Sequence, residues 1–392
     1  MPKLKTLKDI NLKNQRALVR VDFDLPLDEK GNIIDDFRLK ESLPTIKYLI
    51  KQKSKIILIS HLDRPGGRRI KKLSLAQVAQ RLRNISRKKV RFSKEITGWS
   101  VKKTIEMMGF GQILLLENLR FNPGEEKNSP KLAKELAGFG DIFINEAFAV
   151  SHREHASIVG ISRYLPSVLG FRFEKEIKEL NKILFRPKRP LVAVIGGAKI
   201  STKIKVINKF LQIADYVLIG GALSNTIFAS RGFDMADSVI DKESFEDIEK
   251  INLRNPKLFL PIDLAIWNKN RVYYKDVSGL FKGEKALDIG PKTIDLFSDL
   301  IEKAKMIIWN GPLGLTIQKP FDKASKAIVD AISETKAYSV VGGGDTIAFI
   351  REIKKEKVFD HLSTGGGAML DYLANETLSG TEAIKECKRF GK

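Results

Sequence analysis

The chain has 392 residues, of which 43% are hydrophobic and 30% charged, so it is not disordered or collagen-like, and two globular domains are expected. The single cysteine excludes a disulfide-stapled scaffold and fits a reducing compartment. Its formal charge of +22 favours anionic partners such as nucleic acid, an anionic membrane or phosphorylated metabolites, and residues 1–185 carry 16 of these 22 charges.

Apolar runs of strand length alternate with amphipathic stretches along the first half. The predicted strands are Arg16–Phe23, Lys55–Ser60, Gln112–Glu117 and Asp141–Asn145. The predicted helices between them include Asp36–Gln52 and Leu75–Ile85. Near-continuous apolar strands joined by helices are typical of a parallel sheet that is covered on both faces.

The same alternation begins again after a charged, helix-like segment, Phe171–Leu184. The predicted strands of the second half are Leu191–Ile195, Tyr216–Ile219, Lys257–Leu260, Met306–Trp309, Tyr338–Val341 and Phe359–Leu362. Its predicted helices include Ser201–Ile213, Pro291–Ala304, Asp322–Glu334 and Gly366–Leu373. We therefore expect a doubly wound α/β domain over 1–170, a connecting helix over 171–185 and a second such domain over 186–375.

Basic side chains follow the strands of the first half. Arg64 and His61 come after the second strand, Arg120 follows the third, and Arg153 follows the fourth. Since the ends of parallel strands meet at one sheet edge, these residues are expected to converge there. Several guanidinium groups at one edge suit a phosphate, although any one of them is more often a surface or ion-pair residue.

Glycines follow four strands of the second half, at Gly196-Gly197, Gly220-Gly221, Gly342-Gly343-Gly344 and Gly365-Gly366-Gly367. Each pair or triplet precedes a predicted helix, whose free N–H groups attract anions. Four such turns favour a nucleotide site, but neither a P-loop nor a dinucleotide-binding fingerprint is present.

Two further features of this half are ambiguous on their own. Lys199 and Lys203 lie four residues apart at the start of a predicted helix, which would put both ammonium groups on one face, where they would bind phosphate or simply face solvent. Asp345 follows a glycine run, where it would cap a helix or help to hold Mg²⁺.

Nine motifs, in order along the chain, resemble those of phosphoglycerate kinase. They begin with Arg20-Val-Asp-Phe-Asp-Leu-Pro26, Ser60-His-Leu-Asp-Arg-Pro65 and Leu116-Glu-Asn-Leu-Arg-Phe-Asn-Pro-Gly-Glu-Glu126. They continue with His152-Arg-Glu-His-Ala-Ser157, Gly196-Gly-Ala-Lys-Ile-Ser-Thr-Lys203, Leu287-Asp-Ile-Gly-Pro-Lys292, Trp309-Asn-Gly-Pro312, Gly342-Gly-Gly-Asp-Thr346 and Ser363-Thr-Gly-Gly-Gly-Ala368. The resemblance covers nearly the whole chain.

The resemblance implies two domains that face each other across a cleft, a hinge helix over 171–185, and a tail over 376–392 that packs back on the first domain. It also implies reversible transfer of the acyl phosphate of 1,3-bisphosphoglycerate to MgADP, giving 3-phosphoglycerate and MgATP. Such a protein is expected to be a cytoplasmic monomer, with Mg²⁺ bound beside ADP or ATP. Its partners would be these small molecules, and neither a membrane nor nucleic acid is expected.

Site residues carry over from the family motifs onto matching positions. The phosphoglycerate site would comprise Asp22, Asp24, Arg38, His61 (cationic when protonated), Arg64, Arg120 and Arg153. The nucleotide site would comprise Gly197, Lys199, Lys203, Gly221, Asn310, Pro312, Gly343, Gly344, Asp345 and Thr346, with Asp345 nearest the metal. The transferring phosphoryl would be steadied by Arg38, Lys199, Lys203, Gly365, Gly366 and Gly367.

Five positions depart from the family pattern. Asp24 stands where the family usually has Asn, and Asp63 where it has Gly. Glu146 stands where it has Asp, and Ala149 where it has Gly. Ile317 replaces the Glu that usually holds the nucleotide ribose. These departures leave open an alternative, a degenerate relative that acts as a basic anion- or nucleic-acid-binding module.

Overall fold

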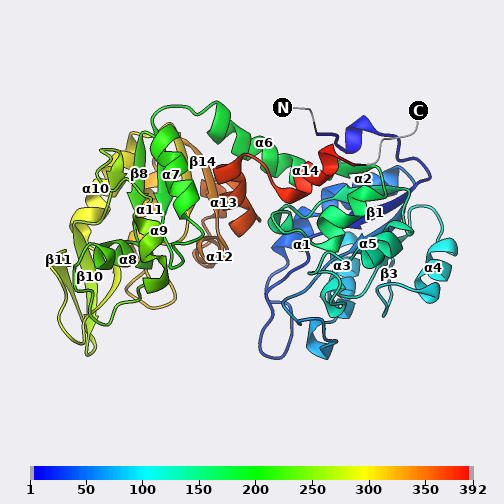
Figure 1. Cartoon of the computed structure of the whole chain (residues 1–392), viewed down its shortest axis with the longest axis horizontal. Coiled ribbons are helices and arrows are strands. Elements are labelled where there is room, and N and C mark those ends of the chain that lie inside the picture. The colour runs from blue at the N-terminus through cyan, green and yellow to red at the C-terminus, as the bar shows by residue number, and fades with distance from the viewer. Residues whose placement is uncertain (1–3, 388–392) are drawn as a thin grey trace. The chain divides into compact units, whose positions relative to one another are not determined.

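The computed structural model of this chain describes residues 4–387 (Figure 1). Within them the chain forms two compact units, one that runs to Lys178 and resumes at Thr377, and another that spans Glu179–Glu376. The first three residues of the chain and the end of the expected 376–392 tail lie outside the described residues. No helix in 4–387 combines the length and apolar character that a membrane crossing requires.

The first unit is built on six parallel strands in the order β3-β4-β2-β1-β5-β6. They are β1 (Arg16–Arg20), β2 (Lys55–Ile59), β3 (Val90–Phe92), β4 (Ile113–Leu115), β5 (Ile142–Asn145) and β6 (Ser167–Leu169). Its helices are α1 (Phe37–Glu41), α2 (Leu43–Lys51), α3 (Ala76–Ser86), α4 (Trp99–Glu106), α5 (Pro130–Ala137) and α14 (Ser379–Lys385). The sequence missed the short strands β3 and β6, each only three residues long.

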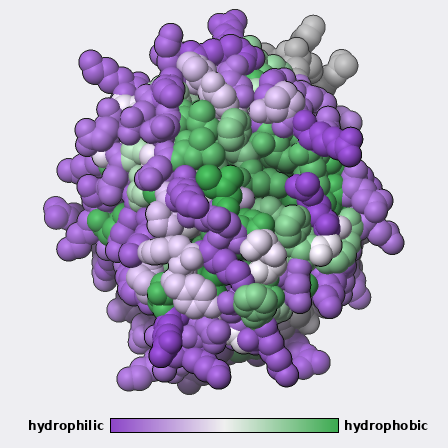
Figure 2. All heavy atoms as spheres, turned by 90° about the vertical axis from the view of Figure 1, so that its left-hand side faces the viewer, coloured by the Kyte–Doolittle hydropathy of each residue, from purple (hydrophilic) through white to green (hydrophobic). Residues whose placement is uncertain are grey.

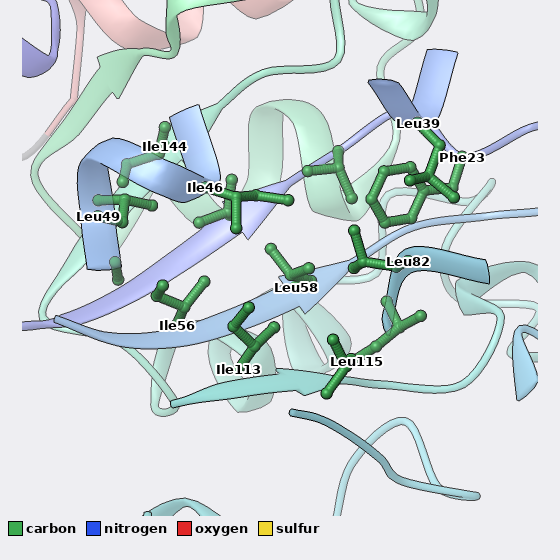
Figure 3. Close-up of a cluster of buried hydrophobic side chains, with 14 of the residues drawn as sticks. Phe23, Leu39, Ile46, Leu49, Ile56, Leu58, Leu82, Ile113, Leu115 and Ile144 are labelled. Carbon is green, nitrogen blue, oxygen red and sulfur yellow. The ribbon is translucent and has the colours of Figure 1, made fainter. Parts of the chain in front are cut away.

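Both faces of this sheet are buried, as expected for a parallel sheet. On one face, side chains of α1, α2 and α3 pack onto alternate strand residues, among them Ile56, Leu58 and Ile113 (Figure 3). On the other face, Leu18, Ile57 and Leu114 pack into a second core that includes α5. This sandwich fixes the strand ends, from which the loops of the first candidate site emerge.

The helix expected over Asp36–Gln52 is in fact two helices, α1 and α2, divided at Ser42. Pro44 lies in the first turn of α2, where its missing N–H cannot continue the hydrogen bonds of α1. The break places Arg38 on the short helix α1 rather than on a continuous helix with α2.

The second unit repeats the plan with strand order β15-β14-β13-β7-β8-β9. These strands are β7 (Leu191–Ile195), β8 (Tyr216–Ile219), β9 (Leu258–Phe259), β13 (Met306–Asn310), β14 (Tyr338–Gly342) and β15 (His361–Leu362). The helices are α7 (Ile204–Ile213), α8 (Ala222–Ser230), α9 (Phe245–Ile248), α10 (Pro291–Glu302), α11 (Lys323–Ser333), α12 (Gly344–Glu352) and α13 (Gly366–Asn375). All six strands were predicted from the sequence, and the α/β class with doubly wound parallel sheets is confirmed.

A three-stranded antiparallel sheet in the second unit was missed. It comprises β10 (Asp263–Asn268), β11 (Arg271–Asp276) and β12 (Lys285–Ile289). Lys269 and Asn270 both have positive φ, which suits the tight turn between β10 and β11. On the side that carries β10, β11 and α10, apolar side chains gather in a patch bordered by hydrophilic ones (Figure 2). Val272, Tyr274 and Ile294 of these elements line a cavity of about 220 Å³.

Helix α6 (Phe171–Phe185) contains the boundary between the two units, at Lys178 and Glu179. Gly170 precedes it, and the buried Glu146 carboxylate accepts hydrogen bonds from the Arg172 N–H in its first turn. Helix α14 packs on the first unit, where the Gly380 N–H donates to the Ser151 carbonyl.

We expect Gly170→Ala to lower the free energy of unfolding by about 2 kcal/mol, because its methyl group would overlap the Glu146 carboxylate. Chemical denaturation measures this loss. Gly109→Ala is the matched control, since its Cβ meets only the end of the flexible Gln112 side chain, 3.3 Å away. Equal losses in the two variants would contradict the packing at α6.

Candidate functional site

The first candidate site lies at the carboxyl edge of the first sheet, where segments that follow several strands meet. Asp22 and Asp24 follow β1, His61 follows β2, and Arg120 lies in the turn after β4. Arg38, on α1, donates to the Asp24 carbonyl oxygen at 3.1 Å and lies 3.1 Å from Asp22 Oδ2. The structure thus brings these predicted residues together.

Asp22 is 6% exposed, and its carboxylate is the principal charge partner of Arg38. This attraction is the main reason that the pKa of Arg38 is raised, and it outweighs the opposing effect of burial. Arg38 therefore stays cationic at any physiological pH, and its remaining guanidinium N–H groups are donors with a fixed geometry.

Both carboxylate oxygens of Asp24 face hydrogen-bond donors. The Asp63 N–H donates to Oδ1 at 2.7 Å, and Oδ2 lies 3.5 Å from His61 Nε2. Burial opposes ionisation, but the contacts with His61, the Asp63 N–H and the Arg38 charge hold the pKa of Asp24 below its usual range. The Asp24 side chain is therefore a carboxylate at neutral pH.

His61 is held in one tautomer. Arg20 Nη2 lies 3.0 Å from His61 Nδ1, and because a guanidinium has no acceptor, Nδ1 must accept. Nε2 then carries the proton and points towards Asp24. Burial, together with the charges of Arg20 and Arg120, lowers the pKa of His61. The sequence analysis counted His61 as a possible cation, but this environment keeps it neutral.

Arg120 is 4% exposed and donates to the Asp63 carbonyl oxygen at 2.8 Å. Its Nε lies 3.2 Å from Glu126. Burial lowers the pKa of Arg120, and the nearby charge of Arg153 acts in the same direction. A buried guanidinium that is also affected by the charge of a second one is an arrangement that a bound anion would stabilise.

The remaining predicted residues of this edge are less constrained. Arg153 is half-buried, and the described part of the chain provides no ion pair for it. Arg64 is exposed, and within residues 4–387 no hydrogen bond or ion pair fixes its guanidinium. The structure therefore brings Arg153 to the other arginines but leaves the direction of Arg64 open.

Sequence reasoning did not single out the buried groups behind this edge. Arg20, 1% exposed, donates through Nε to Ser157 Oγ at 2.8 Å, and Ser157 in turn donates to the fully buried Glu125. Burial raises the pKa of Glu125, and the charge of Arg20 opposes that rise. His155 lies beside them, and burial together with the arginines lowers its pKa to about 3. An Arg inside an apolar strand run was the available signal for Arg20.

The second candidate site lies at the carboxyl edge of the second unit's parallel sheet, where the glycine turns meet. The Gly197 N–H donates to the Pro312 carbonyl oxygen at 2.8 Å, and a Cβ on Gly196 would overlap that oxygen. Gly221 has φ +68°, and a Cβ there would lie 2.8 Å from the Gly197 nitrogen. Only glycine permits this approach of the turns after β7, β8 and β13.

Lys203 and Lys199 differ from the expectation of one shared helix face. Helix α7 begins at Ile204, so Lys199 lies in the preceding turn, exposed, whereas Lys203 is 7% exposed and donates to the Gly196 carbonyl oxygen. The prediction of a helix from Ser201 was wrong, because residues 196–203 form a turn around the glycines. Burial lowers the pKa of Lys203 to about 8, although the Asp345 charge opposes this effect.

The turn after β14 completes this edge. Gly343 has φ +98°, and the buried Thr346 hydroxyl accepts from the Gly311 N–H at 2.9 Å. Asn310 is 6% exposed, yet its side-chain Nδ2 has no hydrogen-bond partner among the described residues. Gly344 and Asp345 occupy the first turn of α12, where both are exposed. An unpartnered amide donor beside a helix N-terminus suits a phosphate oxygen.

The last glycine run begins helix α13. Gly365 is its N-cap, and the Gly365 N–H donates to Ser363 Oγ at 3.2 Å. Gly366 and Gly367 follow in the first turn, where N–H groups have no partner within the helix. Ile317, in the position where the family usually has a ribose-binding Glu, is 89% exposed.

Within residues 4–387, no group of three or more His, Cys, Asp or Glu side chains has the arrangement of a metal site. Asp345 is a single exposed carboxylate beside the glycine turns. One carboxylate fits Mg²⁺ that takes its other ligands from substrate phosphates and water, which is the usual pattern for this ion.

Comparison with known proteins gives one consistent result. A family model described as phosphoglycerate kinase matches residues 7–376. The phosphoglycerate kinases of Pseudothermotoga lettingae and Chloroflexus aggregans are 41% and 42% identical, each over 98% of this chain and 99% of its own length. The solved phosphoglycerate kinase of Coxiella burnetii has a TM-score of 0.84 at 32% identity, covering 98% of this chain and 99% of its own. The solved phosphoglycerate kinase of Pyrococcus horikoshii has a TM-score of 0.86 at 31% identity, and the match covers 97% of this chain and 98% of its own.

We predict that His61 is neutral with its proton on Nε2 at pH 6.5, because burial lowers its pKa and Arg20 occupies Nδ1. Long-range ¹H–¹⁵N spectra of protein labelled at its four histidines measure both properties. A His61→Gln variant assigns the signal. An imidazolium signal at pH 6.5, or a proton on Nδ1, would contradict the Arg20 contact.

Proposed function

The chain belongs to the phosphoglycerate kinase family, and we propose that its two sheet edges bind the two substrates of one phosphoryl transfer. The enzyme is a kinase that moves the acyl phosphate of 1,3-bisphosphoglycerate to MgADP, giving 3-phosphoglycerate and MgATP. In our proposal the first edge holds the phosphoglycerate and the second holds the nucleotide. The alternative of a nucleic-acid-binding module is not favoured, because the family match extends over both units.

The observation that carries the assignment of the first edge is the juxtaposition of Arg120 and Arg153. Burial is the main cause of the lowered pKa of Arg120 and the charge of Arg153 adds to it, and a bound phosphate would offset both effects. Asp22 would accept a hydrogen bond from the substrate hydroxyl, and His61 would donate through Nε2. Arg64 would reach the ligand from its exposed loop.

At the second edge, the N–H groups of Gly197, Gly221 and the first turn of α12 would contact phosphate oxygens. Lys203, Asn310, Pro312 and Thr346 would line the same site, with Gly343 and Gly344 admitting close approach of the ligand. Asp345 is the carboxylate suited to Mg²⁺, which supplies positive charge beside the phosphates when bound.

Phosphoryl transfer spreads negative charge over three equatorial oxygens, so catalysis depends on positioned positive charge. We assign that stabilisation to Arg38, Lys199 and Lys203, with the glycine-rich turn Gly365, Gly366 and Gly367 at the start of α13 receiving charge through the N–H groups of Gly366 and Gly367. An acyl phosphate needs no general base, because the attacking ADP oxygen is already ionised. The chain's own residues therefore orient the reactants and exclude water.

The two sites belong to separate compact units, so transfer takes place in an arrangement of the units that holds the reactants in line. We propose α6 over 171–185 as the hinge, because it contains the boundary at Lys178 and Glu179. We further propose that the protein works as a monomer in the cytoplasm. A single cysteine and small-molecule substrates support that setting.

Arg38→Ala and Lys199→Ala should each lower kcat by roughly 100-fold or more, since each removes a charge placed for the transition state. A coupled assay of MgATP formation from 1,3-bisphosphoglycerate measures the loss. Lys205→Ala is the control, because this exposed lysine on α7 removes equal charge outside the site. A wild-type protein without Mg²⁺-dependent turnover would refute the proposed function.

Nucleotide affinity should fall as pH rises through about 8, because burial lowers the pKa of Lys203 to about 8 and deprotonation removes its charge. Below that pH the ammonium is present and affinity is at its plateau. Titrations of MgADP between pH 6.5 and 9.5 measure the change. Lys203→Arg should remove the decline, since guanidinium stays protonated, and a decline that persists in this variant would exclude Lys203 as its source.

A further inference from the structure

Asp24 introduces a carboxylate into the group of cations that the proposed function assigns to the substrate. Its Oδ2 lies 3.5 Å from His61 Nε2 and 4.0 Å from Arg38 Nη1. Its charge also acts on Arg20 and on Arg120. A negatively charged side chain therefore lies among the groups that would bind an anionic ligand.

This carboxylate is fixed rather than free to swing into solvent. The Asp63 N–H donates to Oδ1 at 2.7 Å, and the Asp24 N–H donates to Asp22 Oδ1 at 3.4 Å. Arg38 also donates to the Asp24 carbonyl oxygen, which anchors the backbone beside the same guanidinium. The Asp24 side chain is one-third exposed, so its position borders the space open to a ligand.

Asp63 makes this arrangement possible through its backbone. It has φ +55°, a left-handed conformation that Asp tolerates better than most residues. In this conformation its N–H donates to Asp24 while its carbonyl oxygen accepts from Arg120 at 2.8 Å. One residue thus links the internal carboxylate to the arginine pair.

We propose that Asp24 is an internal counter-ion that competes with the substrate anion for Arg38, His61 and Arg120, and so sets the anion affinity of the first site. A ligand phosphate or carboxylate must share these donors with a fixed negative charge, which weakens binding of every anion. The cost in free energy is similar for anions of similar charge, so a ligand with many other contacts still binds, whereas a simple anion such as inorganic phosphate has little affinity left. Asp24 therefore limits anion binding at this site in a chain whose net charge of +22 attracts anions generally.

The inference rests on the proposed function for its ligand, but its test does not need turnover. Asp24→Asn removes the charge and keeps an oxygen for the Asp63 N–H. We expect calorimetric titrations to show roughly three- to tenfold tighter binding of 3-phosphoglycerate, with a gain in the same range for inorganic phosphate. The dissociation constant of MgADP, titrated without phosphoglycerate, should not change, because Asp24 lies in the other unit.

Glu29→Gln is the matched control, since this exposed carboxylate follows the same strand and its loss changes the net charge equally. It should leave both affinities within twofold of the wild type. Asp24→Ser is a second variant without the charge, and thermal melts establish that each variant is folded. Unchanged or weaker binding in a folded Asp24 variant would overturn the inference.

The two proposals fail separately. Tighter phosphate binding by Asp24→Asn in a protein without kinase turnover would support the counter-ion role and refute the proposed function. Normal turnover in the wild type with equal anion affinity in Asp24→Asn would support the function and overturn the counter-ion role. A gain as large in Glu29→Gln would also overturn it, because the effect would then be general electrostatics.

Discussion

All strands of a parallel sheet point in one direction, so every segment that follows a strand emerges at the same edge, and both candidate sites depend on this constraint. In the first unit it gathers Asp22, His61 and Arg120 from segments far apart in the sequence. In the second it gathers the glycine turns after β7, β8 and β13. Because the sheets are buried on both faces, these edges have little freedom to rearrange.

In the proposed function both edges bind phosphate, but by different means. The first uses side chains, and it keeps their charges in place with buried groups behind them, as in the contact from Arg20 to Ser157 and on to Glu125. The second uses the backbone, because glycine lets the turns approach closely and exposes N–H groups at helix starts. Lys203 combines both modes, since it is buried against the Gly196 carbonyl.

Departures from the family pattern have different consequences. Asp24 and Asp63 are coupled through one hydrogen bond, so the two changes act together on the first site. Glu146 is buried against the start of α6 and belongs to packing rather than to ligand contact. Ile317 is exposed, and nothing in the structure explains why an apolar side chain stands there.

The sequence by itself determined the α/β class, because buried parallel strands are continuous apolar runs. It also predicted candidate site residues after the strand ends, which a parallel sheet places at one edge. It did not reveal the sheet of β10, β11 and β12. Strand β11 of this sheet is largely exposed and has no apolar run from which a strand could be predicted. Only the tertiary structure decided that Lys199 and Lys203 have different environments, that His61 is neutral, and that Asp24 faces three cationic or donor groups. Burial and the direction of each hydrogen bond set these properties, and both arise from contacts between residues distant in the chain.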